Sequence, residues 1–129
     1  MEERLNILLV EDNILNQRVV TFSLKRYNHT VIVANNGVEA IERFCENKFD
    51  VILMDIMMPV MDGIEATVKI REIEILDNKK IRTPIIALTA NIMDNDRDKC
   101  LSYGMDEFMA KPFDIEKLKS IFLELKISS

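Results

Sequence analysis

Four short apolar runs of this chain each end at a side chain that could take part in chemistry. The side chains are three carboxylates, a hydroxyl and an ammonium: Glu11 and Asp12 after residues 7–10, Asp55 after 51–54, Thr89 after 85–88 and Lys111 after 108–110. Carboxylates are ligands for hard divalent cations, and an ammonium neutralises the charge of a phosphoryl group. These side chains therefore suit a site for a metal ion and a phosphoryl group.

The apolar runs are typical of strands that are buried on both faces of a parallel sheet. In open parallel α/β sheets, ligands bind outside the carboxyl ends of the strands, and all five side chains stand at that end of their runs. We therefore expect them to meet at one edge of the sheet. The runs alone do not fix the order of the strands, so which of them are neighbours stays open at this point.

Bringing Glu11, Asp12 and Asp55 together has an electrostatic cost, because two like charges ~4 Å apart repel by about 4 kcal/mol at an effective dielectric near 20. Such a cluster either keeps a proton or recruits a cation, and a small site of oxygen ligands favours Mg²⁺. Asp55 is the candidate nucleophile, since carboxylates can form aspartyl-phosphate intermediates. Lys111 and Thr89 would then bind the oxygens of the incoming phosphoryl group.

Helical patterns alternate with the strand patterns along the chain. Strands are predicted at residues 7–10, 30–34, 51–55, 85–88 and 108–110, and helices at about 13–27, 38–45, 63–76, 93–102 and 115–125. The apolar face expected for the third helix consists of Ile64, Val68, Ile73 and Leu76. Five strands alternating with five helices imply parallel βαβ units with right-handed crossovers, which is a doubly wound α/β fold in a single domain.

The composition is ordinary for a soluble globular protein and narrows the range of partners. Hydrophobic residues make up 48% and charged residues 30% of the 129 residues, and no apolar stretch is long enough to span a membrane. The net charge of −5 disfavours unaided binding of nucleic acid, and the N-terminus lacks the apolar core of a secretory signal. Cys45 and Cys100 are too few for a disulfide framework, so we expect buried, reduced thiols in the cytoplasm.

The motifs at the strand ends resemble those of the receiver domain of two-component response regulators. The matching stretches are LVEDN at 9–13, MDIMMPVMDG at 54–63, PIIALTA at 84–90 and KPF at 111–113. The resemblance spans essentially residues 1–129 and implies one receiver domain with a flavodoxin-like fold, in which five parallel strands take the order 2-1-3-4-5 and are flanked by five helices. That order would place strands 1, 3, 4 and 5 side by side, so that their ends can form one site.

The resemblance also implies a role for each site residue. Asp55 accepts a phosphoryl group from a phosphohistidine, and Thr89 and Lys111 bind the phosphoryl oxygens. The implied ligands of Mg²⁺ are the side chains of Asp12 and Asp55, the backbone carbonyl of Met57 and, through water, Glu11. Thr89 and Phe108 stand at the positions of a conformational switch, although Phe108 is equally well explained as a plain core aromatic.

A narrower resemblance is to receivers that are fused to hybrid sensor histidine kinases, and residues 11–17, 61–67, 88–91 and 100–106 carry it. It implies a histidine kinase or a histidine-phosphotransfer domain as partner, docked on Ile14, Leu15 and Phe113; the alternative for the first two is burial in the core. The expected function is a cytoplasmic signalling switch and not an enzyme. The domain itself would contact neither membrane nor nucleic acid, and would be a monomer or a weak phosphorylation-dependent dimer.

Two other functions remain open. A pseudo-receiver would bind a partner without being phosphorylated, but the intact set of acidic, hydroxyl and ammonium side chains argues against it. A Mg²⁺-dependent phosphohydrolase usually carries a second acid two residues after the nucleophile, where Met57 stands, and it needs a substrate-selecting cap for which the chain has no residues. His29 is the only histidine, lies in no metal-binding motif and is predicted to be a surface residue.

Overall fold

The computed structural model describes residues 4–56, 61–77, 82–89, 96–111, 113–125 and 127. The strands are β1 (Asn6–Val10), β2 (Thr30–Ala34), β3 (Val51–Asp55), β4 (Ile85–Thr89) and β5 (Glu107–Ala110). The helices are α1 (Ile14–Arg26), α2 (Gly37–Glu46), α3 (Gly63–Leu76), α4 (Asp96–Ser102) and α5 (Ile115–Leu125). All ten predicted elements are present in this part of the chain; residues 93–95 of the predicted fourth helix lie outside the described residues.

The five strands form one parallel sheet in the order β2-β1-β3-β4-β5. This is the flavodoxin-like order, so the predicted fold is confirmed. The chain runs outward from β1 to β2, returns to β3 on the other side of β1, and then continues outward through β4 to β5. The neighbours β1 and β3 therefore flank the point at which the strand order reverses, where ligands bind in folds of this class.

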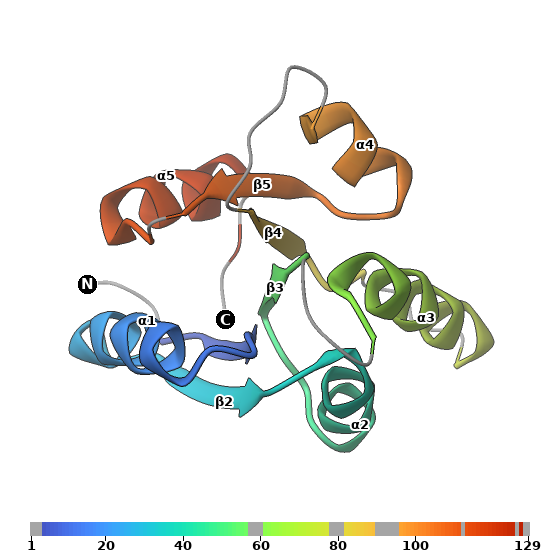
Figure 1. Ribbon diagram of the computed structural model, residues 1–129, viewed down its shortest axis with the longest axis horizontal. Helices are drawn as coiled ribbons and strands as arrows, with labels where there is room; N and C mark the ends of the chain where they lie inside the picture. The colour runs from blue at the N-terminus through green and yellow to red at the C-terminus, as the bar shows by residue number, and fades with distance from the viewer. Residues whose placement is uncertain are drawn as a thin grey trace.

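Helices cover both faces of the sheet (Figure 1). The helices α1 and α5 lie on one face, and α2, α3 and α4 lie on the other. Successive residues of a strand point to opposite faces, so Leu8 and Val10 of β1 pack under α2 and α3 while Ile7 and Leu9 pack under α1 and α5. Burial on both faces explains the unbroken apolar runs of the central strands.

Three helices begin at side-chain caps that fix the loops leaving the sheet. Asn13, Asn36 and Asp62 each accept a hydrogen bond from the backbone N–H three residues later, which satisfies a donor of the first helical turn. A side chain at Gly63 would collide with the backbone carbonyl of Asp55. Glycine at this position therefore lets the start of α3 pack directly against the end of β3.

The buried face of α3 differs from the predicted one. Val68 and Leu76 are exposed, while Ala66, Thr67, Ile70 and Glu74 are buried. Glu74 can be buried because Arg71 pairs with it at 2.8 Å and the Thr83 N–H donates to its second oxygen. The prediction placed the large apolar side chains on the buried face of the helix. The observed buried face instead includes the small side chains of Ala66 and Thr67.

Two further predictions about single residues were wrong. His29 is buried: its Nδ1 accepts a hydrogen bond of 3.0 Å from the Leu5 N–H, and its ring stands edge-on to Phe122 of α5. Cys45 is exposed near the end of α2, whereas Cys100 is buried as predicted. No helix in the described part of the chain is both long and apolar enough to span a membrane.

Candidate functional site

Backbone hydrogen bonds just beyond the strands hold the site residues in place. The Glu11 N–H donates to Ala34 at 3.0 Å, the Ile56 N–H to Leu88 at 3.2 Å, and the Lys111 N–H to Thr89 at 2.8 Å. Each bond continues the pairing of two strands past their carboxyl ends. Hydrogen bonds to the neighbouring strands therefore hold the backbone from which these polar side chains extend.

The three predicted carboxylates lie together. Glu11, Asp12 and Asp55 each offer an oxygen, and these oxygens all lie within 4.8 Å of one another. Glu11 is 1% exposed and Asp55 is 3% exposed, whereas Asp12 faces solvent. The cluster is thus closed from below by the sheet and open on one side, as a site for a hydrated cation requires.

Lys111 bridges the two buried carboxylates. Its Nζ lies 3.0 Å from Glu11 Oε1 and 3.1 Å from Asp55 Oδ2. The other oxygen of Glu11 accepts a hydrogen bond from the Asn13 N–H at 3.2 Å. The Lys111 ammonium therefore partly neutralises both Glu11, which follows β1, and Asp55, which ends β3. With three carboxylates and one ammonium, the cluster retains an excess of negative charge.

Burial is the largest influence on the pKa values of this cluster. It raises the pKa of Asp55 to about 6, and the Glu11 carboxylate adds to the increase. Burial also acts to raise the pKa of Glu11, but the Asn13 N–H and the Lys111 ammonium outweigh it and hold that pKa below its ordinary value. At Lys111 burial acts to lower the pKa, yet Glu11 and Asp55 together raise it. Of the two carboxylates that Lys111 contacts, Asp55 is therefore the one whose charge is less well compensated.

Two of the remaining predicted residues lie on the strands β4 and β5. Thr89 is buried at the end of β4, one residue beyond Leu88, which pairs with Asp55. Phe108 lies on β5 beside Ala87 and packs, half-buried, against the core on the α2, α3 and α4 face. Met57 lies outside the described residues.

Gln17 is a site residue that the sequence did not indicate. Its side-chain amide donates to the Glu11 carbonyl at 2.6 Å and to Asn35 Oδ1 at 2.7 Å. It thereby ties α1 to the ends of β1 and β2 beside the acidic cluster. Gln17 ends the stretch 11–17 that carries the resemblance to hybrid-kinase receivers, but that resemblance assigned it no role in the site.

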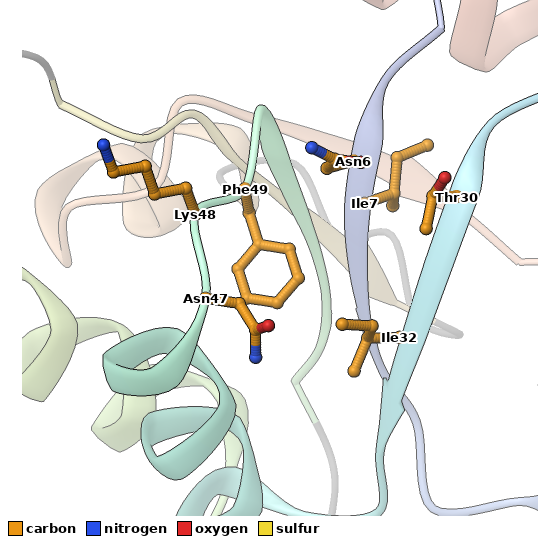
Figure 2. A pocket seen from close by; sticks show the side chains of 7 residues that line it. All are labelled: Asn6, Ile7, Thr30, Ile32, Asn47, Lys48 and Phe49. Atoms are coloured by element: carbon orange, nitrogen blue, oxygen red, sulfur yellow. The ribbon is translucent and has the colours of Figure 1, made fainter.

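Two hollows help to delimit the site. A cavity of about 230 Å³ adjoins the cluster between α1 and β5, and its lining includes Glu11, Val19, Lys111 and Phe113. Another, of about 360 Å³, lies at the opposite ends of β1 and β2, where the ring of Phe49 faces Ile32 (Figure 2). None of the described residues that line this second hollow is acidic, so it offers no carboxylate ligands. The acidic cluster lies at the other end of the sheet, beyond the carboxyl ends of the strands.

Comparison with known sequences gives a consistent result. The sequence profile of the response regulator receiver domain matches residues 7–123. Histidine kinase 5 of Arabidopsis thaliana is 38% identical in an alignment 135 residues long, and the match covers 88% of this chain and 15% of that protein. Hybrid signal transduction histidine kinase B of Dictyostelium discoideum is 46% identical over 115 residues, which cover 82% of this chain and 6% of that protein. The chain thus spans only a small part of these relatives.

Comparison with solved structures agrees. A chain in the co-crystal structure of the Saccharomyces cerevisiae histidine phosphotransfer signalling protein Ypd1 and the receiver domain of its response regulator Ssk1 has a TM-score of 0.86 and 32% identity; the match covers 96% of this chain and 90% of that one. The receiver domain of a Pseudomonas aeruginosa sensor histidine kinase, crystallised with a magnesium ion in its active-site cleft, has a TM-score of 0.81 and 40% identity over 94% of this chain and 96% of that one.

Proposed function

Because this chain belongs to the response regulator receiver domain family of two-component and phosphorelay systems, we propose that Asp55 accepts a phosphoryl group from a phosphohistidine on a partner protein. The observation that carries the proposal is the position of Lys111, whose ammonium lies within 3.1 Å of Asp55 while Glu11 and Asp12 stand beside it. The arrangement supports the proposal, because a carboxylate that could act as nucleophile, an ammonium that could bind phosphoryl oxygens and two further carboxylates lie together at one edge of the sheet.

The transfer is a displacement at phosphorus. A carboxylate oxygen of Asp55 forms a bond to phosphorus, the bond from phosphorus to the imidazole nitrogen breaks, and the electron pair returns to the ring. Asp55, with a pKa of about 6, is largely ionised near neutral pH and can act as nucleophile. Lys111 would stabilise the charge on the transferring oxygens, and the Thr89 hydroxyl would donate a hydrogen bond to one of them.

The acidic cluster fits Mg²⁺. Three carboxylate oxygens within 4.8 Å of one another, with one carboxylate open to solvent, suit a small hard cation that keeps part of its water shell. Asp12 and Asp55 would hold the ion directly, Glu11 through water and Met57 by its backbone carbonyl. When bound, Mg²⁺ supplies positive charge to the oxygens of the phosphoryl group.

The partner that we propose is a histidine kinase or a histidine-phosphotransfer domain. Ile14 and Leu15 support this, since they are 63% and 69% exposed at the start of α1, immediately after the acidic cluster, and are not core residues. Phe113 lines the adjoining cavity and would complete the docking surface. Phosphorylation would then shift Thr89 and Phe108 and so change the surface of the domain. We propose that residues 1–129 form a single receiver domain. It would act in the cytoplasm as a monomer or a weak phosphorylation-dependent dimer.

Labelling with acetyl phosphate and Mg²⁺ tests the proposal. Mass spectrometry should find one acid-labile phosphoryl group, on Asp55, and none in Asp55→Asn. Asp62→Asn is the matched control, because Asn caps a helix as well as Asp does and the exposed Asp62 caps the nearby α3. Labelling of Asp55→Asn at the wild-type level would refute the assignment. A wild-type protein that binds Mg²⁺ and a partner but takes no label would be a pseudo-receiver instead.

A further inference from the structure

The acidic cluster lies where the pairing of β1 with β3 ends. The register between these two strands stops one residue before Glu11 and one residue before Asp55. Beyond it, the Glu11 N–H donates to Ala34 of β2, whereas the N–H of Ile56, directly after Asp55, donates to Leu88 of β4. The two acidic segments are therefore held from opposite sides, and the spacing between their carboxylates depends on further contacts.

The turn between β2 and α2, residues 35–37, is connected to the first of these segments. Gln17 of α1 makes the connection, because its side-chain amide donates to the Glu11 carbonyl at 2.6 Å and to Asn35 Oδ1 at 2.7 Å. Asn35 is in turn fixed by Glu39 of α2, whose Oε1 accepts hydrogen bonds from the Asn35 backbone at 3.2 Å and side chain at 3.0 Å. The position of the Glu11 backbone therefore depends on the start of α2.

The same turn holds the second acidic segment through Gly37. The Gly37 N–H donates to the Met61 carbonyl at 2.9 Å. Two residues later, the Gly63 N–H donates to the Ile56 carbonyl at 3.0 Å, and Gly63 packs against the carbonyl of Asp55. The helices α2 and α3, which begin at these two glycines, lie side by side on one face of the sheet (Figure 1). A displacement at Met61 would therefore be passed to the backbone of Asp55.

Position 37 has no room for a side chain. A Cβ atom there would lie 2.6 Å from Met61 Cγ and 2.7 Å from the Met61 carbonyl oxygen, which are shorter than van der Waals contacts. Alanine is the better helix former, so the helix α2 does not itself call for glycine at its first residue. The close approach of Met61 therefore explains the glycine.

We infer that the β2–α2 turn sets the spacing of the proposed Mg²⁺ ligands, with Gly37 and Gln17 as positioning residues. The turn has no carboxylate of its own and acts by holding Glu11 and Asp12 on one side and Asp55 on the other. This inference rests on the proposed function and adds to it two residues that touch neither ion nor phosphoryl group. Mg²⁺ demands near-ideal octahedral geometry, whereas Ca²⁺ tolerates irregular coordination, so a displaced ligand should weaken Mg²⁺ binding more than Ca²⁺ binding.

Calorimetric titration of the chain with MgCl₂ and, separately, with CaCl₂ tests the inference. Gly37→Ala should weaken Mg²⁺ binding about tenfold, at the lower end of the effect of residues that orient metal ligands, and Ca²⁺ binding by much less. Gln17→Met keeps the length of the side chain but removes both hydrogen bonds, and it should change the two affinities in the same sense. Partial unfolding would lower both affinities by the same factor, so the ratio of the two affinities reports on the positions of the ligands.

Two variants of α2 are matched controls. Val38→Ala changes an exposed side chain next to Gly37 and should leave both affinities unchanged. Phe44→Leu leaves a cavity on the buried face of the same helix, two turns beyond Gly37, and should lower the urea midpoint while both ions bind as they do to wild type.

Unchanged Mg²⁺ affinity in both Gly37→Ala and Gln17→Met would overturn the inference and leave the proposed function standing. An equal loss of affinity for the two ions would also overturn it, because the substitutions would then act on folding and not on the spacing of the ligands. A wild-type chain that binds no Mg²⁺ and takes no phosphoryl group from acetyl phosphate would overturn the proposed function together with the inference.

Discussion

Replacing Asp55 by Asn should stabilise the metal-free protein. A pKa of about 6 for Asp55, in place of the ordinary 3.8, means that ionising this carboxyl is harder in the folded protein than in the unfolded chain. At about 1.36 kcal/mol per pH unit, the difference is about 3 kcal/mol. Asn keeps the shape of the side chain and removes the charge. The free energy of unfolding should therefore rise by up to about 3 kcal/mol near neutral pH, less what the lost contact with Lys111 contributes.

The pH dependence of this gain has a definite sign. Between pH 3.8 and about 6 the folded state holds a proton at Asp55 that the unfolded chain releases, so wild-type stability falls as the pH rises through this window. Glu11, whose folded pKa lies below 4.5, acts in the opposite direction and only below that pH. The advantage of Asp55→Asn should therefore be largest above about pH 6 and shrink toward zero near pH 4.

Magnesium should remove most of the difference in stability between the two proteins. An ion that binds only the folded state at a hundred times its Kd stabilises by about 3 kcal/mol. Wild type should gain this amount, whereas Asp55→Asn loses one of the two anionic ligands proposed to bind directly and should gain much less. The two proteins should thus differ clearly in EDTA and converge in excess Mg²⁺.

Urea unfolding, followed by circular dichroism at several pH values with EDTA or Mg²⁺, measures all three effects. Glu72→Gln, which removes an exposed carboxylate of α3, is the control and should change stability little. If Asp55→Asn is no more stable than wild type in EDTA at neutral pH, or if its advantage does not depend on pH, then ionised Asp55 does not destabilise the folded protein, and the reasoning from its raised pKa is wrong.

Three further outcomes are expected. Asp12→Ala should bind Mg²⁺ at least tenfold more weakly than wild type in a calorimetric titration, since it leaves one direct carboxylate ligand; equal affinity would show that the metal site has been misplaced. Beryllofluoride, which stands in for a phosphoryl group on Asp55, should alter amide exchange in β4, α4 and β5, and unchanged protection there would contradict a switch at Thr89 and Phe108. Arg71→Met should lower the free energy of unfolding by about 3 kcal/mol in a urea titration. The substitution leaves the buried Glu74 and the partly buried Asp106 without the guanidinium that binds both. A loss below ~1 kcal/mol would mean that Arg82 and backbone donors are enough to satisfy the two carboxylates.

The elements and their alternation could be predicted because burial on both sides of a parallel sheet leaves a direct mark on the sequence. Strands such as β3 are short unbroken apolar runs, and each predicted strand matches the observed one within one residue at either end. The order of the strands has no such mark, because no periodicity records which strand pairs with which. It followed from the resemblance of the strand-end motifs to those of a known family, and the structure confirms it.

Other features could not be predicted from sequence patterns because they depend on individual side-chain contacts, which no periodicity records. His29 is buried because Leu5, just before β1, supplies a backbone donor and Phe122 of α5 supplies an aromatic ring, 24 and 93 residues away. Glu74 is buried because Arg71 and the backbone before β4 satisfy its two oxygens. The partners of His29 are far along the chain, whereas those of Glu74 are three and nine residues away. In both cases a polar residue is buried because its partners satisfy it, and the type of the residue alone suggests the opposite.

One electrostatic property connects the stability of this fold with its proposed chemistry. The strand order sets Asp55 and Glu11 side by side at the ends of β3 and β1, with Asp12 next to them, and Lys111 compensates only part of their charge. Burial, together with the neighbouring Glu11 carboxylate, raises the pKa of Asp55, so the ionised Asp55 lowers the stability of the metal-free protein. The same charge makes the binding of a cation favourable, and a phosphoryl group on Asp55 would in turn be held by that cation and Lys111. Under the proposed function, the destabilising cluster would allow both ligands to shift the folded protein between states, because a ligand can bias an equilibrium only by binding one state more tightly than the other.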